Sequence, residues 1–301
     1  MFDVITFGSV VVDVIVDAHV SEKGKFMYYP IGEKILIKDL EFYIGGGGTN
    51  TAVAFSRLGL RTGFIGKVGD DESEKKIITL LKKEKIKFLG KIQKNGVNGY
   101  SIVLESQEKD RTILTYKGVN DQLSFKELKL GELKTKWVYL SALLGESFKT
   151  QKKLVRYLNK KGVKIAFNPS SYIIKKLDLK PILKFCEVVV LNKEEAQMFV
   201  KKGDLLVELR KLGPRIVVIT DRNKLISAYD GKKKYFLKPH KIKVMDRTGA
   251  GDAFASGFVA GRIAGKSIPD SLKLGLRESE AEIKYHGVKN KLLRMRLKKR
   301  K

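Results

Sequence analysis

The run from 246 to 257, Asp-Arg-Thr-Gly-Ala-Gly-Asp-Ala-Phe-Ala-Ser-Gly, contains the residue types needed to hold an anion. Its Gly-Ala-Gly turn lets backbone N–H groups approach a ligand closely, and the small residues after Asp252 predict a helix whose positive end faces that ligand. A carboxylate there repels a bound phosphate unless it takes up a proton or a cation intervenes. Asp252 is therefore a candidate general base beside a phosphoryl group. The alternative is that it only caps the helix, and the motif alone leaves both interpretations open.

A second glycine-rich stretch, Gly45-Gly46-Gly47-Gly48-Thr49-Asn50, precedes a segment with helical spacing that ends at Gly59. An Asn and a small-faced helix directly after four glycines favour a ligand-binding loop over a flexible linker. Asp13 lies among β-branched residues of an extended run, where a carboxylate is either paired or directed into a site. We interpret it as a site residue. The stretch is not a dinucleotide fingerprint, because Asn50 replaces the last glycine, and the sequence contains no P-loop.

Segments typical of strands and helices alternate along most of the chain and predict a largely parallel sheet covered on both faces. Ligands of such folds bind beyond the carboxyl ends of the strands. Four polar or glycine-rich segments follow predicted strands and are expected to share one crevice: 45–50, 192–195, 220–222 and 249–252. Paired strands near 11–16, 35–43, 100–104 and 111–116 break this alternation and predict a separate small sheet.

The composition is strongly basic, with 61 Lys and Arg against 33 Asp and Glu and a net charge of +28. Such a field attracts nucleic acid or phosphorylated ligands. Because the lysines are spread over the whole chain, a solvated basic surface is favoured over a nucleic-acid interface. The run from Lys291 to Lys301 is expected to be a frayed basic terminus. No segment approaches the ~20 apolar residues of a membrane span, no signal peptide is visible, and Cys186 is expected to be a buried thiol of a cytoplasmic protein.

Three elements in order along the chain resemble the ribokinase family of carbohydrate kinases, also called the PfkB family. They are the glycine-rich loop ending in Asn50, the Asn192-Lys193-Glu194-Glu195 element and the Asp-x-x-Gly-Ala-Gly-Asp run ending in Asp252. The resemblance implies a three-layer α/β/α sandwich with a mostly parallel central sheet and a small β-sheet lid. It further implies a single domain over residues 1–301, with lid strands inserted from about 10–43 and 98–118. The implied activity is ATP-dependent phosphorylation of a sugar hydroxyl in the presence of Mg²⁺.

The resemblance also implies a role for each matching residue. Asp252 would accept the hydroxyl proton while the N–H groups of Gly249, Ala250 and Gly251 stabilise charge on the transferring phosphoryl group. The sugar would bind at Asp13, Gly46, Gly47 and Asn50, and the nucleotide at Asn192, Thr220, Arg222 and Gly251. Asn192 and Glu195 would organise Mg²⁺ through water, since Mg²⁺ sheds its hydration shell reluctantly. Asp246 and Thr248 stand where some family members hold a monovalent cation such as K⁺.

The sequence departs from the family on the nucleotide side. Where the family has Thr-x-Gly-x-x-Gly, this chain has Arg222 and Leu225 in place of the glycines, and Glu278 stands where small residues are expected near the adenine. Three functions follow: a sugar kinase, a nucleoside kinase of the same mechanism, or a catalytically faded member that binds polyanions. The missing fingerprint disfavours a dinucleotide oxidoreductase. An exposed edge of the lid sheet predicts a homodimer through the lid.

Overall fold

The computed structural model describes residues 1–24, 26–106, 111–284 and 289–297. Its centre is a nine-stranded sheet in the order β17-β16-β15-β14-β13-β12-β1-β6-β8, parallel from β15 to β8. Strands β16 and β17 extend it as antiparallel neighbours. The strands are β1 (Phe2–Phe7), β6 (Thr62–Ile65), β8 (Lys87–Phe88), β12 (Thr135–Ser141), β13 (Lys164–Asn168), β14 (Val188–Asn192), β15 (Ile216–Thr220), β16 (Ile226–Tyr229) and β17 (Lys234–Leu237).

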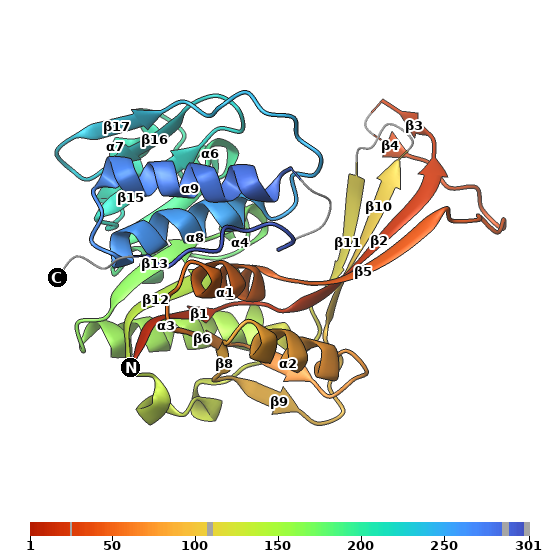
Figure 1. The fold of residues 1–301 in the computed structure, drawn as a ribbon, viewed down its shortest axis with the longest axis horizontal. Coiled ribbons are helices and arrows are strands. Elements are labelled where there is room, and N and C mark those ends of the chain that lie inside the picture. Colours follow the sequence, from red (N-terminus) through yellow and green to blue (C-terminus); the bar gives the residue numbers. More distant parts are fainter. Residues whose placement is uncertain (25, 107–110, 285–288, 298–301) are drawn as a thin grey trace.

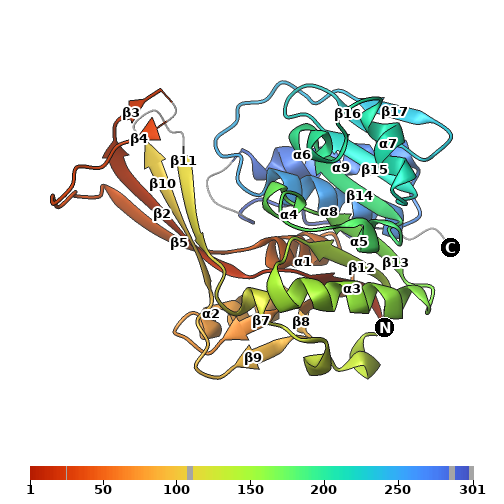
Figure 2. The ribbon, with the colours of Figure 1, turned by 180° about the vertical axis from the view of Figure 1, so that it is seen from behind.

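Helices cover both faces of this sheet (Figures 1 and 2). One face packs against α1 (Gly47–Arg57), α2 (Glu74–Lys83), α8 (Ala250–Ile263) and α9 (Ile268–Glu282). The other packs against α3 (Gly145–Asn159), α4 (Ser171–Ile174), α5 (Lys180–Leu183), α6 (Lys193–Phe199) and α7 (Leu205–Lys211). Central strands such as Val188–Asn192 are almost wholly apolar because both of their faces are buried. The predicted α/β/α sandwich is confirmed.

A separate four-stranded sheet, the lid, projects from one side of the sandwich (Figure 1). Its order is β11 (Arg111–Tyr116), β10 (Gly99–Ser106), β2 (Val11–Val20) and β5 (Asp39–Gly45), so the last strand begins at residue 39 and not at 35. Short pieces join these elements: β3 (Glu22–Lys23), β4 (Phe26–Met27), β7 (Lys67–Gly69), β9 (Lys91–Gln93), and the 3-10 turns η1 (Gly118–Asp121), η2 (Phe125–Glu127) and η3 (Leu130–Glu132).

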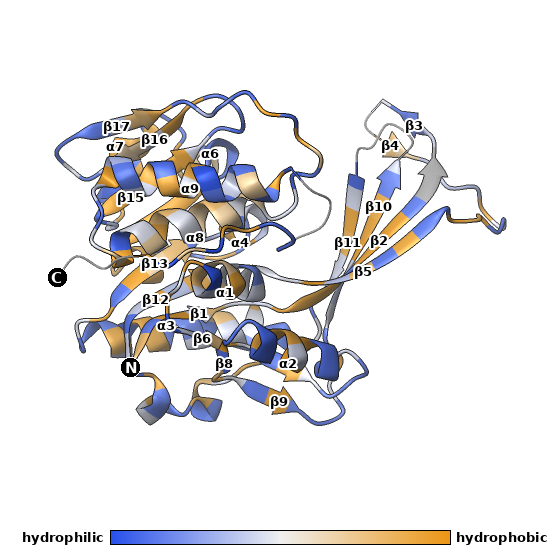
Figure 3. Cartoon of the chain, viewed as in Figure 1, coloured by the Kyte–Doolittle hydropathy of each residue, from blue (hydrophilic) through white to orange (hydrophobic). Residues whose placement is uncertain are grey.

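The two faces of the lid differ in chemistry because side chains alternate along a strand. Registers of the four strands place odd-numbered residues on one face, among them Asp13, Tyr43 and Ser101. These line cavities against the sandwich. Even-numbered residues form the opposite face, where Phe42 is 57% and Leu114 is 53% exposed. Figure 3 shows hydrophobic residues along these lid strands.

The last described residues, 289–297, pack against the sandwich. Leu292 and Leu297 are buried, and the N–H groups of Met295 and Leu297 donate to the carbonyls of Arg57 and Leu58 at the end of α1. The expectation of a frayed terminus from residue 291 is therefore wrong for 291–297, because apolar side chains interrupt the basic ones and anchor the segment. Residues 298–301 lie outside the described part. Within that part, no helix combines the length and apolarity needed to cross a bilayer.

Candidate active site

Asp252 lies in the first turn of α8, but its carboxylate does not cap the helix. The N-cap position is Gly249, with a left-handed φ of 77° that favours glycine, and no side chain caps the helix there. The Asp252 Oδ2 atom instead accepts a hydrogen bond of 2.9 Å from the Asn50 amide nitrogen. Asn50 belongs to α1, so the two glycine-rich motifs meet at this contact. The capping interpretation of Asp252 is therefore wrong.

The environment of Asp252 makes it a better proton acceptor than an exposed aspartate. Burial raises its pKa above the ordinary value, and the hydrogen bond from Asn50 and the charge of Lys289 partly oppose that rise. A carboxylate with a raised pKa has more drive to take a proton from a hydroxyl group. The geometry thus fits a general base in the first turn of α8.

Two cavities meet at Asp252. The first, here called the lid-side cavity, has a volume of about 300 Å³ and the second, the strand-end cavity, about 240 Å³. Both are lined by Asn168, Gly249 and Asp252. Of the predicted site residues, the lid-side cavity is also lined by Asp13, Gly46, Gly47, Asn50 and Thr248, and the strand-end cavity by Asn192, Glu195, Thr220 and Gly251. Asp252 therefore forms part of the wall of both cavities.

The glycine-rich loop shapes the lid-side cavity. A Cβ atom on Gly45 would lie 1.8 Å from Oδ2 of Asp13, so only glycine leaves room for that carboxylate. Gly46 has a φ of 95°, which L side chains rarely adopt. A Cβ on Gly47 would lie 3.6 Å from Oδ1 of Asp252, which places the free carboxylate oxygen of the base beside this loop. The glycines thus bring backbone, Asp13 and Asp252 to one wall.

Polar groups of the lid-side cavity suit a hydroxylated ligand. Burial raises the pKa of Asp13 to about 6, against the opposing charge of Lys289 and a hydrogen bond from Ser101. The buried Oγ atom of Ser141 lines the same cavity and has no hydrogen-bond partner among the described residues. A buried hydroxyl without a hydrogen-bond partner lowers the stability of the fold unless a ligand or water molecule bonds to it.

The strand-end cavity contains the predicted cation-binding pair. Asn192 and Glu195 form a reciprocal capping box at the start of α6: the Glu195 N–H donates to Asn192 Oδ1 at 2.8 Å, and the Asn192 N–H donates to Glu195 Oε2 at 3.0 Å. Burial raises the pKa of Glu195 to about 7. The described residues include no group of three or more His, Cys, Asp and Glu suited to a metal. A single buried carboxylate fits Mg²⁺ held mainly by water and phosphate oxygens.

The start of α8 is open toward this cavity. A Cβ on Gly251 would meet nothing within 4 Å, so packing within the chain does not require glycine there. The N–H of Ala250 donates to the carbonyl of Arg247 over 3.3 Å, which is longer than an ordinary hydrogen bond. The first N–H groups of a helix have no partner within that helix and therefore attract anions.

Residues that depart from the family pattern lie outside both cavities. Arg222 is exposed, keeps a left-handed φ of 47° and pairs with Glu194 over 3.0 Å. Leu225 is 45% exposed. Glu278 is fully buried, and its Oε2 accepts the N–H of Leu293 over 3.1 Å. Glu278 therefore holds the C-terminal segment and does not line the strand-end cavity.

The predicted monovalent-cation residues already bind a cation of this chain. Arg111 of β11 donates to Asp246 Oδ1 over 2.6 Å and to Thr248 Oγ1 over 2.5 Å. Although burial opposes it, hydrogen bonds from Thr248 and Arg111 hold the pKa of Asp246 below its ordinary value. This contact ties the lid to the segment before α8. Sequence reasoning missed Arg111, since nothing distinguishes it from other basic residues.

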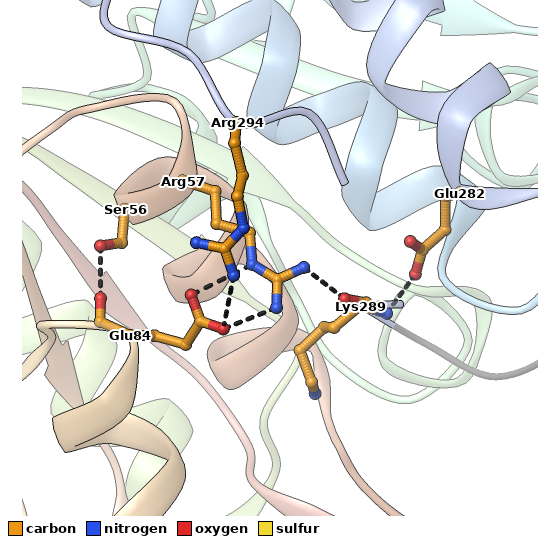
Figure 4. Close-up of polar contacts among 6 residues, drawn as sticks. All are labelled: Ser56, Arg57, Glu84, Glu282, Lys289 and Arg294. Atoms are coloured by element: carbon orange, nitrogen blue, oxygen red, sulfur yellow. Dashed lines mark hydrogen bonds and ion pairs between the residues drawn. The ribbon is translucent and has the colours of Figure 1, made fainter. Parts of the chain in front are cut away.

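Lys289 is the second site residue that sequence reasoning missed. It is 7% exposed, and its ammonium donates to Asn50 Oδ1 over 2.6 Å. Figure 4 shows its backbone between Arg57 and Glu282. One lysine in a run of basic residues carries no signal of this placement.

Comparisons with known proteins show the family to which this fold belongs. Residues 1–294 match the model of the pfkB family carbohydrate kinases. A 5-dehydro-2-deoxygluconokinase of Clostridium perfringens is 30% identical, with 88% of this chain and 89% of the relative covered. A cytidine kinase of Thermococcus kodakarensis is 28% identical, with 91% and 97% covered.

Solved structures share the fold. Ribokinase of Arabidopsis thaliana, solved with ribose and ATP, has a TM-score of 0.82 at 19% identity, with 97% of this chain and 96% of that chain covered. A structure from E. coli described as a ribokinase II, in complex with ATP and Mg²⁺, has a TM-score of 0.81 at 17% identity, with 95% and 94% covered. With the family model matching nearly its whole length, the chain belongs to the pfkB family carbohydrate kinases and is a phosphotransferase that acts on an alcohol group.

Proposed function

We propose that this protein transfers the γ-phosphoryl group of ATP to a hydroxyl of a sugar, with Asp252 as the general base. The observation that carries the proposal is the position of Asp252 where the lid-side and strand-end cavities meet. A base at this junction reaches the acceptor on one side and the transferring phosphoryl group on the other. Phosphoryl transfer needs mainly such positioning and charge stabilisation from the protein.

In this mechanism the sugar binds in the lid-side cavity, with its hydroxyls at Asp13, Asn50 and the backbone of Gly46 and Gly47. Asp252 takes the hydroxyl proton, the freed oxygen forms a bond to the γ-phosphorus, and the bond to the β-phosphate oxygen breaks to release ADP. The backbone N–H groups of Gly249, Ala250 and Gly251 face the charge that develops on the phosphoryl oxygens. Such donors are worth about 3 kcal/mol each in other enzymes.

Asn192, Thr220 and Gly251 supply the nucleotide side, and Arg222 would contact the nucleotide on leaving Glu194. Glu195, with Asn192, would hold Mg²⁺ through water, and the ion supplies positive charge that neutralises the phosphates. A cation beside Glu195 also offsets the cost of ionising a carboxylate whose pKa burial raises to about 7. A K⁺ ion would bind at Asp246 and Thr248 only in a conformation in which Arg111 no longer contacts them.

The test is the isosteric substitution Asp252→Asn. We expect the turnover number for ATP-dependent phosphorylation to fall by several orders of magnitude, while thermal stabilisation by the acceptor is largely kept. Ser141→Ala, which removes one hydroxyl from the same cavity, should affect acceptor binding more than turnover. Turnover retained in Asp252→Asn would refute the assignment of the base.

A nucleoside acceptor is the second candidate. A further cavity of about 730 Å³ between the lid and residues 244–247 has room for a base attached to the sugar. Its carboxylates, Asp17, Asp39, Glu41 and Glu105, suit the amino groups of a nucleobase. A phosphate-transfer screen of free sugars against nucleosides decides between the two, with turnover on nucleosides alone favouring this candidate.

A faded, polyanion-binding member has less support, because the contact between Asp252 and Asn50 and the open turn at Gly251 favour an intact active site. That alternative predicts salt-sensitive binding of RNA together with no thermal stabilisation by ATP.

We also propose a homodimer through the lid. The even-numbered face carries Leu40, Phe42, Ile102, Leu114 and Tyr116, each at least 40% exposed. The chain carries a net charge of +28, so a partner of opposite charge would bind charged surface and not this apolar face, whereas a second copy matches it by two-fold symmetry. Sedimentation of Phe42→Lys should give a monomer where the parent gives a dimer; a monomeric parent would refute the proposal.

A further inference from the structure

Lys289 is held in place by its backbone. Its N–H donates to Glu282 Oε1 of α9 over 2.6 Å, and its carbonyl accepts from Arg57 of α1 (Figure 4). Arg57 is itself fixed by Glu84, which accepts from Nη2 over 2.6 Å and from Nε over 3.1 Å. The φ of Lys289 is 69°, a left-handed value that non-glycine residues rarely adopt. A strained backbone conformation persists only where surrounding contacts hold it in place, and such conformations are common at functional sites.

The side chain of Lys289 fixes the orientation of the Asn50 amide. An ammonium only donates hydrogen bonds, so the atom of Asn50 that it contacts must be the oxygen. The amide nitrogen then points away from Lys289 and donates to Asp252 Oδ2 over 2.9 Å. Lys289, Asn50 and Asp252 therefore form one chain of hydrogen bonds in which each donor and acceptor is assigned by chemistry.

The charges around Lys289 come from four elements. Among the described residues, Asp13 of β2, Glu282 of α9 and Asp252 of α8 supply three carboxylates, and Arg57 of α1 supplies an opposing cation. Burial lowers the pKa of Lys289 to about 8, and the carboxylates oppose that shift. At neutral pH the ammonium is thus the buried positive charge that compensates both carboxylates of the lid-side cavity. Lys289 does not line that cavity and acts from behind Asn50.

We propose that Lys289 is a positioning residue for the base: it turns the Asn50 amide toward Asp252 and keeps Asp252 ionised between Asp13 and Glu282. This inference rests on the proposed role of Asp252. Two consequences follow. Proton acceptance at neutral pH depends on the C-terminal segment, and an acceptor hydroxyl meets Asn50 with its amide already oriented.

The test compares Lys289→Met with the parent enzyme over pH 5.5 to 9. Methionine conserves the unbranched shape and removes the charge and the donor. We expect the acidic limb of the turnover number to move upward by about one pH unit or more, as loss of a nearby opposite charge implies. Below that shifted limb turnover should fall relative to the parent, and it should recover as the pH rises toward 8.5. Lys284→Met, an exposed lysine five residues earlier, is the matched control and should leave the profile unchanged.

A role confined to folding predicts a different outcome. In that case Lys289→Met would lower the melting temperature and the amount of active enzyme, while the shape of the pH profile stayed that of the parent; this result would overturn the proposal. If Lys289→Met does not fold, Lys289→Gln keeps a neutral donor toward Asn50 and should show the same upward shift. Turnover retained in Asp252→Asn would refute the proposed base itself, so the two failures are distinguishable.

Discussion

Gly251→Ala should make the protein more stable and less active. A methyl group at this position meets nothing within 4 Å, so it creates no clash within the chain. Alanine in place of a helical glycine stabilises by about 0.5–1 kcal/mol, which corresponds to a rise in melting temperature of roughly 1–3 °C for a chain of this size. In the proposed mechanism the same methyl group occupies space through which the phosphoryl group approaches the N–H groups of α8.

The expected loss is on the order of 10²-fold in kcat/KM for ATP, the scale seen when one stabilising donor is lost from an active site. Steady-state kinetics with ATP as the varied substrate, together with thermal melting, measures both effects. The matched control is Gly131→Ala in η3, which is also in open space and lies outside both cavities. An active and more stable Gly251→Ala variant would refute the placement of the phosphoryl group at this turn.

Three further predictions follow from the structure. Gly45→Ala should raise the KM for the acceptor at least about tenfold with a smaller change in kcat, because its Cβ would lie 1.8 Å from Asp13; an unchanged KM would remove Asp13 from acceptor binding. Glu278→Gln should flatten the pH dependence of thermal stability. Burial raises the pKa of Glu278 to about 8. The protonated Glu278 therefore stabilises the folded state at low pH, and this contribution is lost as the pH rises toward 8. At pH 8 the variant should be more stable than the parent, and parallel stability curves from pH 5 to 8 would contradict this. Arg111→Met should make turnover respond to K⁺, because Asp246 and Thr248 lose their internal cation; a response absent in both enzymes would exclude a cation there.

The sandwich was predictable because its signal is local. Buried parallel strands are marked by apolar runs such as 188–191, and the segment after that run has helical spacing. The same reasoning located the loops at the carboxyl ends of the strands, which is why Asn192, Thr220 and Gly251 were found to line one cavity.

The chemistry of the site depends on contacts that no local pattern encodes. The carboxylate of Asp252 accepts a hydrogen bond from Asn50, which lies 202 positions earlier in the chain, and does not cap its own helix. Lys289 reaches Asn50 across 239 positions, and Arg111 reaches Asp246 across 135. At Arg222 the local pattern suggested a larger change than the structure has. Its backbone keeps a φ of 47°, as a glycine would, and its side chain pairs with Glu194. The substitution therefore changes the surface more than the loop.

Side chains alternate between the two faces of the lid sheet, so each face can change independently of the other. Adjacent positions such as 13 and 14, or 101 and 102, face opposite sides of the same sheet. The proposed acceptor site can therefore be varied at odd-numbered positions, and the proposed dimer interface at even-numbered ones, without either set of substitutions reaching the other surface. A library that randomises only Ile15, Tyr43, Val103 and Ile113 would explore new acceptors while the apolar surface behind them stays as it is.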